Sequence, residues 1–337
     1  MNKRLSLLLQ YIVFLGLGLF LVWWSVRSLT DEEVAQLKGA LRNARYLLVL
    51  PAMVMLLLSH YSRALRWRML MEPLGFEPRA TNTFLAVMLG YFFNLLVPRM
   101  GEVMKCTMLA RYEKTPVDRL IGTMVAERAL DVVCLAIVIA LTFLLQTDLA
   151  GRVMGAEVER LARGFQGIGG IPGILLGIAV VVGGAWLFLQ LIKRFSHIGW
   201  IAKTRGLFLG VMQGLTSIRH IRRKTAFLLH TLFIWSMYLC SIYLGFQAME
   251  PVSHLGLNPS MTILSVGSLA MIVTQGGIGA YQIAVQKSLG MYGIGAVDGL
   301  AFGWLLWAFQ TILILISGIL CLVLLPIVNR KRRESLV

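Results

Sequence analysis

Long apolar runs dominate this chain, and its polar residues gather in short segments between them. An α-helix of about 20 predominantly apolar residues is long enough to cross a bilayer. Runs of this kind predict six full spans, at residues 5–26, 46–65, 117–145, 171–192, 225–249 and 300–327. The pattern therefore predicts an all-α, polytopic membrane protein built as a single integral membrane domain.

Two further apolar stretches are each interrupted by polar residues and glycine. The first, 82–112, breaks at Pro98 and Arg99, and the second, 260–290, breaks at a group of glycines after Gln275. The arms beside each break are about 10–16 residues long, which is too short to span comfortably. Charges and broken helices are tolerated at membrane depth only where they are buried in protein or line a watery cavity. We therefore expect the two breaks to face each other and form the working site.

The placement of Lys and Arg indicates how these stretches enter the membrane, because cytoplasmic flanks are enriched in both. The basic segments are residues 3–4, 63–68, 193–224 and 330–333. A single crossing by 82–112 would put 193–224 outside, and a single crossing by 260–290 would put the C-terminal basic segment outside. Both stretches are therefore predicted to be re-entrant hairpins, one from each side, with the N- and C-termini in the cytoplasm.

This topology divides the chain into two halves of the same design. Residues 1–150 and 171–330 each read span, span, hairpin, span, but they start from opposite sides of the membrane. Such inverted repeats recur in secondary transporters, which place the binding site near the midplane at discontinuous helices. No clear sequence identity links the halves, so the repeat is predicted from topology alone.

Composition supports the membrane class. The chain is 58% hydrophobic and 14% charged, whereas soluble domains are about 45–50% apolar and about 25% charged. The net charge of +16 is best explained by cytoplasmic Lys and Arg that meet anionic lipid headgroups, so nucleic acid is not an expected partner. The scattered cysteines form no CxxC pair and no Cys/His cluster, and the chain has no HExxH and no Walker A motif. We therefore expect no metal site, no cofactor and no catalytic residue.

Local spacing predicts one additional helix and the state of two histidines. Thr30 and Glu33 have the spacing of a capping box, so a short interfacial helix is predicted before the second span. His60 and His230 lie singly in or at the end of apolar runs. A packed, hydrogen-bonded histidine is the expected state of both, in preference to a proton relay.

The first break supplies three charged candidates for binding a lipid headgroup. Arg99, Glu102 and Lys105 lie at the predicted hairpin tip and on its second arm. In the functional interpretation, Arg99 or Lys105 binds a lipid phosphate and Glu102 binds a cation or a proton. The alternative is an ion pair between Glu102 and Lys105, three residues apart on one helix, that holds the hairpin together.

The neighbouring spans add two charged groups. Glu127, Arg128 and Asp131 share a helix on which Arg128 can reach Asp131, either as a salt-bridge lock or as part of the binding site. Arg63 and Arg66 share one helix face three residues apart. They either bind headgroups at the site or anchor the cytoplasmic end of the span nonspecifically.

The second break supplies flexible backbone and amides. Gly276, Gly277 and Gly279 allow a tight reversal and a close approach of the backbone. With them, Gln275 and Gln282 are candidates to donate hydrogen bonds to a phosphate. No strand precedes these glycines, so they are not a dinucleotide-binding motif.

Four short motifs that contain most of these residues resemble motifs of a known protein family. The chain contains Arg63-x-x-Arg66-Trp67, Pro98-Arg99-x-Gly101-Glu102, Glu127-Arg128-x-x-Asp131 and Gly276-Gly277-Ile278-Gly279, in this order. In these motifs and over nearly its whole length it resembles the flippase-like family that includes the membrane domain of lysylphosphatidylglycerol synthases. The resemblance implies movement of charged phospholipids or polyprenyl-linked lipids across the bilayer. Synthase members carry an added soluble aminoacyl-transfer domain, which this sequence does not contain.

Two positions depart from that family. Gln275 stands where relatives often have Pro, and Tyr281-Gln282 stands where they often have a Glu shortly after the glycines. If that Glu binds an amine headgroup in relatives, the resemblance does not determine the substrate of this chain.

Three functions follow as hypotheses. The first is a lipid transporter or flippase, not an enzyme, in a bacterial-type cytoplasmic (inner) membrane, with a membrane phospholipid or polyprenyl lipid as its partner. The second is an intramembrane lipid-modifying enzyme, and the third is a non-transporting assembly or regulatory partner in the membrane. A second copy of the chain and a separate synthase protein remain open as further partners.

Overall fold

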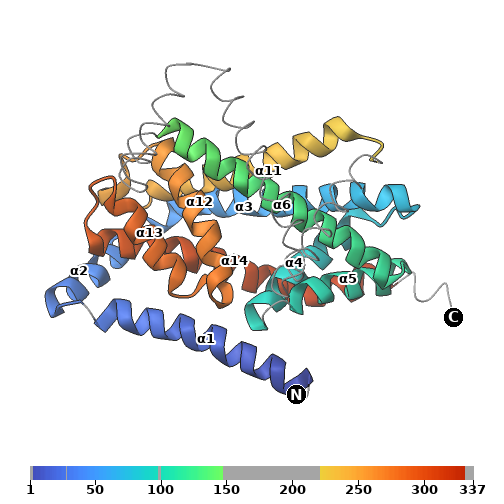
Figure 1. Cartoon of the computed structure of the whole chain (residues 1–337), viewed down its shortest axis with the longest axis horizontal. Helices are drawn as coiled ribbons and strands as arrows, with labels where there is room; N and C mark the ends of the chain where they lie inside the picture. The colour runs from blue at the N-terminus through green and yellow to red at the C-terminus, as the bar shows by residue number, and fades with distance from the viewer. Residues whose placement is uncertain (1–2, 28, 98–99, 147–220, 331–337) are drawn as a thin grey trace, which may run out of the picture. The chain divides into compact units, whose positions relative to one another are not determined.

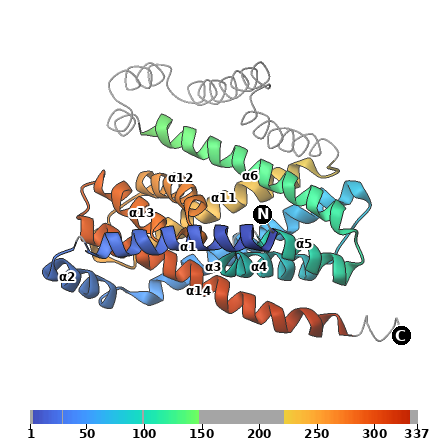
Figure 2. The ribbon, with the colours of Figure 1, turned by 60° about the horizontal axis from the view of Figure 1, so that its bottom comes forward.

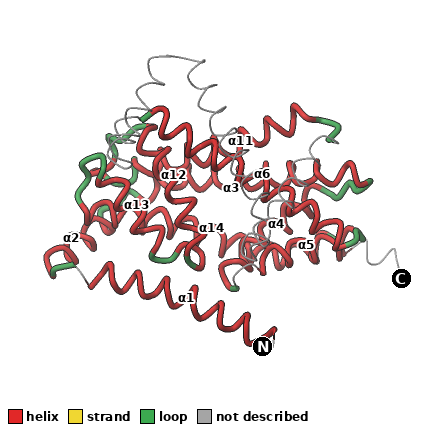
Figure 3. Tube along the Cα trace, viewed as in Figure 1, coloured by secondary structure: helices red, strands yellow, loops and turns green. Residues whose placement is uncertain are grey.

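The computed structural model describes residues 3–27, 29–97, 100–146 and 221–330. By internal contacts the chain forms two compact units, residues 1–124 with 221–337 and residues 125–220, and each is considered by itself. The predicted span at 171–192 and most of the basic segment at 193–224 lie outside the described residues. Every regular element in the described part of the chain is helical, as Figure 3 shows.

The helices follow the order seen in Figure 1. They are α1 (Lys3–Arg27), α2 (Asp31–Arg42), α3 (Leu50–Met71), α4 (Ala80–Leu96), α5 (Met100–Glu113), α6 (Val117–Leu145), α11 (Lys224–Phe246), α12 (Leu257–Val273), α13 (Ala280–Gly290) and α14 (Ala296–Val328). Short 3₁₀ helices lie among them, including η1 (Tyr46–Val49) before α3 and η5 (Gln275–Gly277) between α12 and α13.

Four of the described helical segments are long and apolar enough to cross a membrane: Tyr46–Leu74, Val117–Leu145, Lys224–Phe246 and Ala296–Val328. The prediction of an all-helical polytopic membrane protein is therefore confirmed. The count of six spans and the re-entrant entry of the two hairpins stay predictions.

The predicted helix before the second span is present as α2. Thr30 is its N-cap, and the Thr30 hydroxyl accepts a hydrogen bond from the Glu33 backbone N–H at 3.3 Å. The Glu33 carboxylate accepts one in return from the Thr30 backbone N–H at 2.8 Å. This is the reciprocal capping box that the spacing of the two residues predicts.

The second span ends later than predicted. The sequence pattern ended it at residue 65, in front of the basic cluster, but α3 continues to Met71. The cluster is not an exposed flank, because Arg63, Arg66 and Trp67 are buried and the polar side chains of this turn are hydrogen-bonded to α11. Because these charged side chains have hydrogen-bond partners inside the protein, α3 can continue through the basic cluster and does not end in front of it.

The first broken stretch is an antiparallel helix pair, α4 and α5. The Asn94 side chain accepts a hydrogen bond from the Gly101 backbone N–H at 2.8 Å, which caps the start of α5. A Cβ at Gly101 would collide with the backbone oxygen of Gly90. Gly101 is therefore required by the close packing of the two helices, which is a structural reason for its place in the sequence motif.

The second broken stretch is the pair α12 and α13, joined by η5. Gly276, Gly277 and Gly279 all have positive φ, between 59° and 78°. Residues other than glycine rarely adopt this backbone conformation. The predicted tight reversal is confirmed, and Gly279 also approaches the backbone of α1 at Gly18 so closely that a Cβ would lie 2.7 Å from the Gly18 oxygen.

Both helix pairs pack against the last helix, α14, which runs past α13 and then α4 in Figure 2. At its first half, Gly299 and Gly303 lie against the backbone of α13. At its second half, Cys321 and Leu325 join a buried apolar cluster with α4. Asn329, one residue beyond α14, exchanges two amide hydrogen bonds with Asn82 of α4, at 2.8 and 2.9 Å. Helix α14 thus holds the two broken stretches in register with each other.

Candidate functional site

The two breaks meet directly. The Gln275 side-chain amide donates to the backbone oxygens of Asn94 and Leu95, at 2.6 and 3.4 Å. The Trp307 indole N–H of α14 donates to the Gly276 oxygen at 2.7 Å. The end of α4 and the turn at η5 are therefore tied together, as expected of two breaks that face each other. Arg99 lies outside the described residues.

Helix α3 presents two buried guanidinium groups to α11. Arg63 is 4% exposed and Arg66 is fully buried. Arg63 Nη2 donates to the Tyr238 hydroxyl at 3.3 Å, and Arg66 Nη1 donates to the Thr231 hydroxyl at 3.4 Å. Both guanidinium groups are therefore packed inside the protein against α11.

A third buried cation comes from α5. Lys105 is 3% exposed, and its ammonium lies 4.1 Å from the centre of the Trp67 ring, which is a cation–π contact. The Trp67 indole N–H donates to the Thr123 hydroxyl at 3.0 Å, so the ring is fixed in orientation. Trp67 thus brings Lys105 to the same part of α3 as Arg63 and Arg66, and Glu102 is half-buried one turn earlier on α5.

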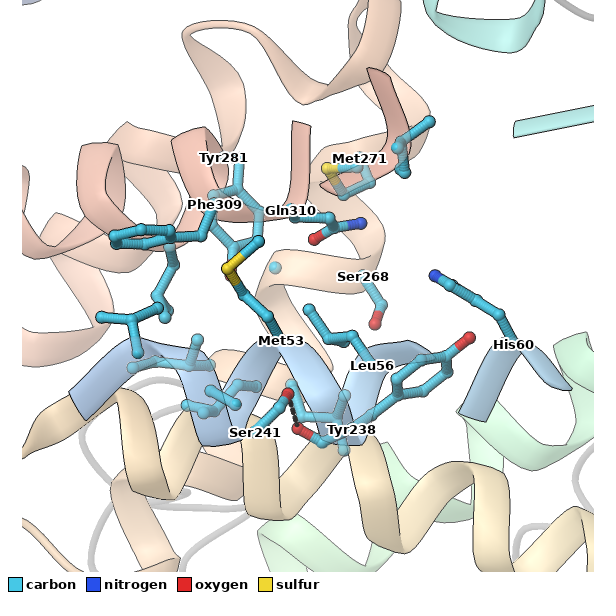
Figure 4. A pocket seen from close by; sticks show the side chains of 18 of the residues that line it. Met53, Leu56, His60, Tyr238, Ser241, Ser268, Met271, Tyr281, Phe309 and Gln310 are labelled. Carbon is cyan, nitrogen blue, oxygen red and sulfur yellow. Dashed lines mark hydrogen bonds between the residues drawn. The ribbon is translucent and has the colours of Figure 1, made fainter. Parts of the chain in front are cut away.

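A cavity of about 170 Å³ lies between the helices next to this basic cluster. Side chains from α3, α4, α11, α12, α13 and α14 line it. His60, Tyr238 and Gln310 are three of them, and each is near the middle of its own long helix. In Figure 4 the His60 imidazole and Tyr238 lie at one end of the cavity and Phe309 lies at the other.

The other candidate residues from the sequence analysis that the structure describes do not line this cavity. Gln282 is 1% exposed, and its backbone packs against Gly303 of α14. Glu127, Arg128 and Asp131 belong to α6 in the second compact unit. There Arg128 Nη1 lies 3.9 Å from Asp131 Oδ2, which is the pair that the spacing predicts, and Glu127 is buried.

The two histidines differ. His230 Nδ1 lies 2.8 Å from the Ser62 hydroxyl, which gives His230 the packed, hydrogen-bonded state that was expected. His60 is 4% exposed, and its ring centre lies 4.6 Å from that of Tyr91, with the two rings tilted by 41°. Within the described part of the chain, neither of its ring nitrogens has a hydrogen-bond partner. His60 is therefore packed as expected, but the hydrogen bond expected of its ring is not found among the described residues.

Sequence reasoning missed most of the cavity wall. Ser268, Gln310 and Tyr238 were not singled out, although Gln310 is a polar residue in the middle of a long apolar run and could have been noticed on that ground. Among the described residues, no three His, Cys, Asp or Glu side chains gather in a group that could hold a metal ion.

The fold and these contacts define an integral, polytopic helical membrane protein with buried cations beside a cavity whose mainly apolar wall contains a few polar groups. A family model described as the lysylphosphatidylglycerol synthase TM region matches residues 8–318. Because this match spans nearly all of the 337 residues, the chain belongs to that family.

One curated relative is similar over a shorter stretch. It is the UPF0104 membrane protein MJ1595 of Methanocaldococcus jannaschii, 30% identical over 92 residues. The matched stretch covers 26% of this chain and 27% of the relative, so it spans about a quarter of the relative's length. No solved structure matches the chain.

Proposed function

We propose that this protein is a transporter, and not an enzyme, that moves a charged phospholipid or a polyprenyl-linked lipid across the membrane. The observation that carries the proposal is the burial of Arg63, Arg66 and Lys105 where α3 meets α5 and α11. Cations at membrane depth are costly and mark the paths of ions or charged substrates. A lipid phosphate is the anion that a bilayer supplies in quantity.

The position of the cavity supports the same function. Its polar residues lie near the middle of α3, α11 and α14, which are long enough to cross a membrane. If these helices span, the cavity lies near mid-depth, where a headgroup in transit most needs polar partners, because an unpaired polar group in hydrocarbon is unfavourable. The acyl or prenyl chains stay in the bilayer while the headgroup passes through the protein.

The transport step would use the two helix pairs as opposed gates. In this proposal α4–α5 enters from the cytoplasmic side, α12–α13 enters from the outside, and both chain termini are cytoplasmic in a bacterial-type inner membrane. The Gln275 to Asn94 hydrogen bond lies where the pairs meet. Alternate separation of the pairs on each side of this contact would expose the site first to one leaflet and then to the other.

The experiment is a lipid-movement assay in vesicles that contain the purified protein. Phosphatidylglycerol with a fluorescent label on its acyl chain is incorporated into both leaflets. An impermeant reductant is added outside, and the fraction of the fluorescence that it bleaches is followed over time. With the wild-type protein the labelled lipid of the inner leaflet is expected to reach the reductant, whereas in empty vesicles it stays protected. No acceleration with this lipid or with a polyprenyl phosphate sugar would contradict the proposal.

The matched variants are Arg63→Gln and Arg42→Gln. Arg63 is buried at the cluster, whereas Arg42 is exposed in the last turn of α2. We expect Arg63→Gln to slow lipid movement about tenfold or more, because loss of a charge-assisted hydrogen bond corresponds to about 1.5–3 kcal/mol. Arg42→Gln is expected to leave the rate unchanged. Thermal unfolding of both variants separates slow movement from failure to fold.

A further inference from the structure

The cavity has the size of one small headgroup. Its volume is about 170 Å³, below the ~300–1,000 Å³ of pockets that bury whole drug-sized ligands. A protein cavity of about 150 Å³ holds a single six-membered carbon ring. The space therefore suits a glycerol unit or one sugar ring, and not a whole lipid.

The wall of the cavity is mainly apolar, and its few Ser, Tyr and Gln polar groups are uncharged. Ser241, Ser268 and Gln310 supply hydroxyl and amide groups, and Tyr281 and Phe309 supply aromatic faces. In the described part of the chain, no Asp or Glu lines the cavity. An ammonium group placed there would meet no carboxylate in that wall, and burying an uncompensated charge is strongly unfavourable.

His60 adds a polar group that is aimed into this space. It is 4% exposed, and neither ring nitrogen has a hydrogen-bond partner among the described residues, while Figure 4 shows the ring directed into the cavity. In a neutral imidazole one nitrogen donates and the other accepts. A hydroxyl group can satisfy either nitrogen because it both donates and accepts, whereas an ammonium group only donates.

The phosphate side of the cavity is identified by Arg63. Its guanidinium donates to the Tyr238 hydroxyl at 3.3 Å, and Tyr238 lines the same end of the cavity as His60. Because the Arg63 guanidinium is hydrogen-bonded to a residue of the cavity wall, the electrostatic potential is more positive at the Tyr238 end than at the Phe309 end. An anionic phosphate is therefore favoured at the Arg63 end, with the rest of the headgroup directed toward Gln310 and Phe309.

From these observations we propose that the cavity selects lipids whose phosphate carries an uncharged polyhydroxyl headgroup, a glycerol or a single sugar, and rejects amine headgroups. The assignment rests on the proposed transport of lipids. Tyr281, which lines the wall and is 8% exposed, provides an aromatic ring and a hydroxyl and no negative charge.

The test uses lipid binding as well as lipid movement. The full-length protein is purified from membranes, and its bound lipids are quantified by mass spectrometry against the membrane extract. Lipids with glycerol or sugar headgroups are expected to be enriched about tenfold over phosphatidylethanolamine, because an unpaired buried ammonium is unfavourable. Phosphatidylglycerol and polyprenyl phosphate sugars are scored separately, so the source of the polyhydroxyl group is identified.

The variant Gln310→Glu replaces a neutral amide of the cavity wall by a carboxylate. It places a carboxylate in the cavity and is expected to remove the enrichment of polyhydroxyl lipids and to raise the share of phosphatidylethanolamine. Gln36→Glu is the matched control, because Gln36 is exposed on α2, and it is expected to bind the same lipids as the wild type. Thermal unfolding confirms that both variants are folded.

The outcomes separate the two proposals. Enrichment of amine lipids by the wild type, or an unchanged lipid profile in folded Gln310→Glu, would overturn the assignment of the cavity and leave the transport function standing. Enrichment of polyhydroxyl lipids without any lipid movement in vesicles would support the cavity assignment as a binding site and refute transport.

Discussion

The side-chain amide of Gln275 donates to the backbone oxygen of Asn94 at 2.6 Å, and this bond joins the turn between α12 and α13 to the end of α4. Residues 181 positions apart in the chain are thereby fixed side by side. The end of a helix leaves carbonyl groups without intrahelical partners. Gln275 satisfies two of these groups at once, at Asn94 and Leu95.

The first prediction concerns this bond. Gln275→Met is expected to lower the free energy of unfolding by about 1–3 kcal/mol, because it removes the donor to two helix-end carbonyls. Gln282→Met is the matched control. Gln282 is 1% exposed, and its amide has no hydrogen-bond partner within the described ranges, so its replacement is expected to be neutral or stabilising. Denaturation in detergent measures both, and equal losses in the two variants would refute this role of Gln275.

The second prediction concerns the packing of α4 against α5. Gly101→Ala is expected to destabilise the protein by about 3 kcal/mol or more, because its methyl group collides with the Gly90 backbone oxygen and neither helix can move without breaking other contacts. At Gly122 on α6 a Cβ meets no atom within 4 Å among the described residues. Gly122→Ala is therefore expected to be neutral or to stabilise by up to about 1 kcal/mol. Size-exclusion profiles and melting temperatures test the pair, and a stable Gly101→Ala protein would contradict the packing described.

The third prediction concerns the ring beneath Lys105. Trp67→Phe keeps an aromatic face but removes the donor to Thr123 and weakens the cation–π contact. We expect a loss of about 1–3 kcal/mol. Trp24→Phe is the control, because Trp24 is 55% exposed and surface changes usually shift stability by less than about 0.5 kcal/mol. Thermal unfolding of the two variants gives the comparison, and similar melting temperatures would show that the Trp67 contacts contribute little.

The sequence predicted the bounds of the broken stretches well, for a physical reason. Pro98 disfavours a continuous helix and the clustered glycines permit a reversal of the chain, so the predicted stretches 82–112 and 260–290 agree closely with α4–α5, residues 80–113, and α12–α13, residues 257–290. The capping box before α2 was predictable because it depends on two side chains three residues apart. Local signals of this kind can be read from the chain directly.

The rest of the site could not be predicted because it depends on contacts between distant residues. Arg63 and Arg66 were placed at the end of a span because nothing in the sequence shows that Tyr238 and Thr231 on α11 contact them. His60 is recognisable as a cavity residue only when α3, α11 and α14 are packed together. The sequence shows which polar residues are unusual, and the packing determines which of them share a site.

The fourth prediction concerns topology. Single cysteines introduced into the acidic first turn of α2 are expected to react with an impermeant thiol reagent from the outside of intact cells. Single cysteines in 193–224 are expected to react only after the cells are opened, because Lys- and Arg-rich segments are retained in the cytoplasm. An outside location of 193–224 would require 82–112 to cross the membrane fully and would refute the re-entrant hairpins.

The central claim is that a lipid headgroup passes where the two helix pairs meet. Its most direct test locks that junction. In a chain whose native cysteines are replaced, Leu95→Cys and Gln275→Cys are joined by a short, reducible thiol cross-linker, since these residues are in contact in the structure. A cross-link between Thr262→Cys and Tyr292→Cys is the control, because it joins residues at the far end of the second pair, whose side-chain oxygens lie 2.5 Å apart.

Movement of fluorescent phosphatidylglycerol in vesicles is then measured before and after reduction. The cross-link between residues 95 and 275 is expected to stop lipid movement, reduction is expected to restore it, and the control cross-link is expected to leave it unchanged. Lipid movement at the wild-type rate with the junction locked would refute passage of the headgroup between the two helix pairs.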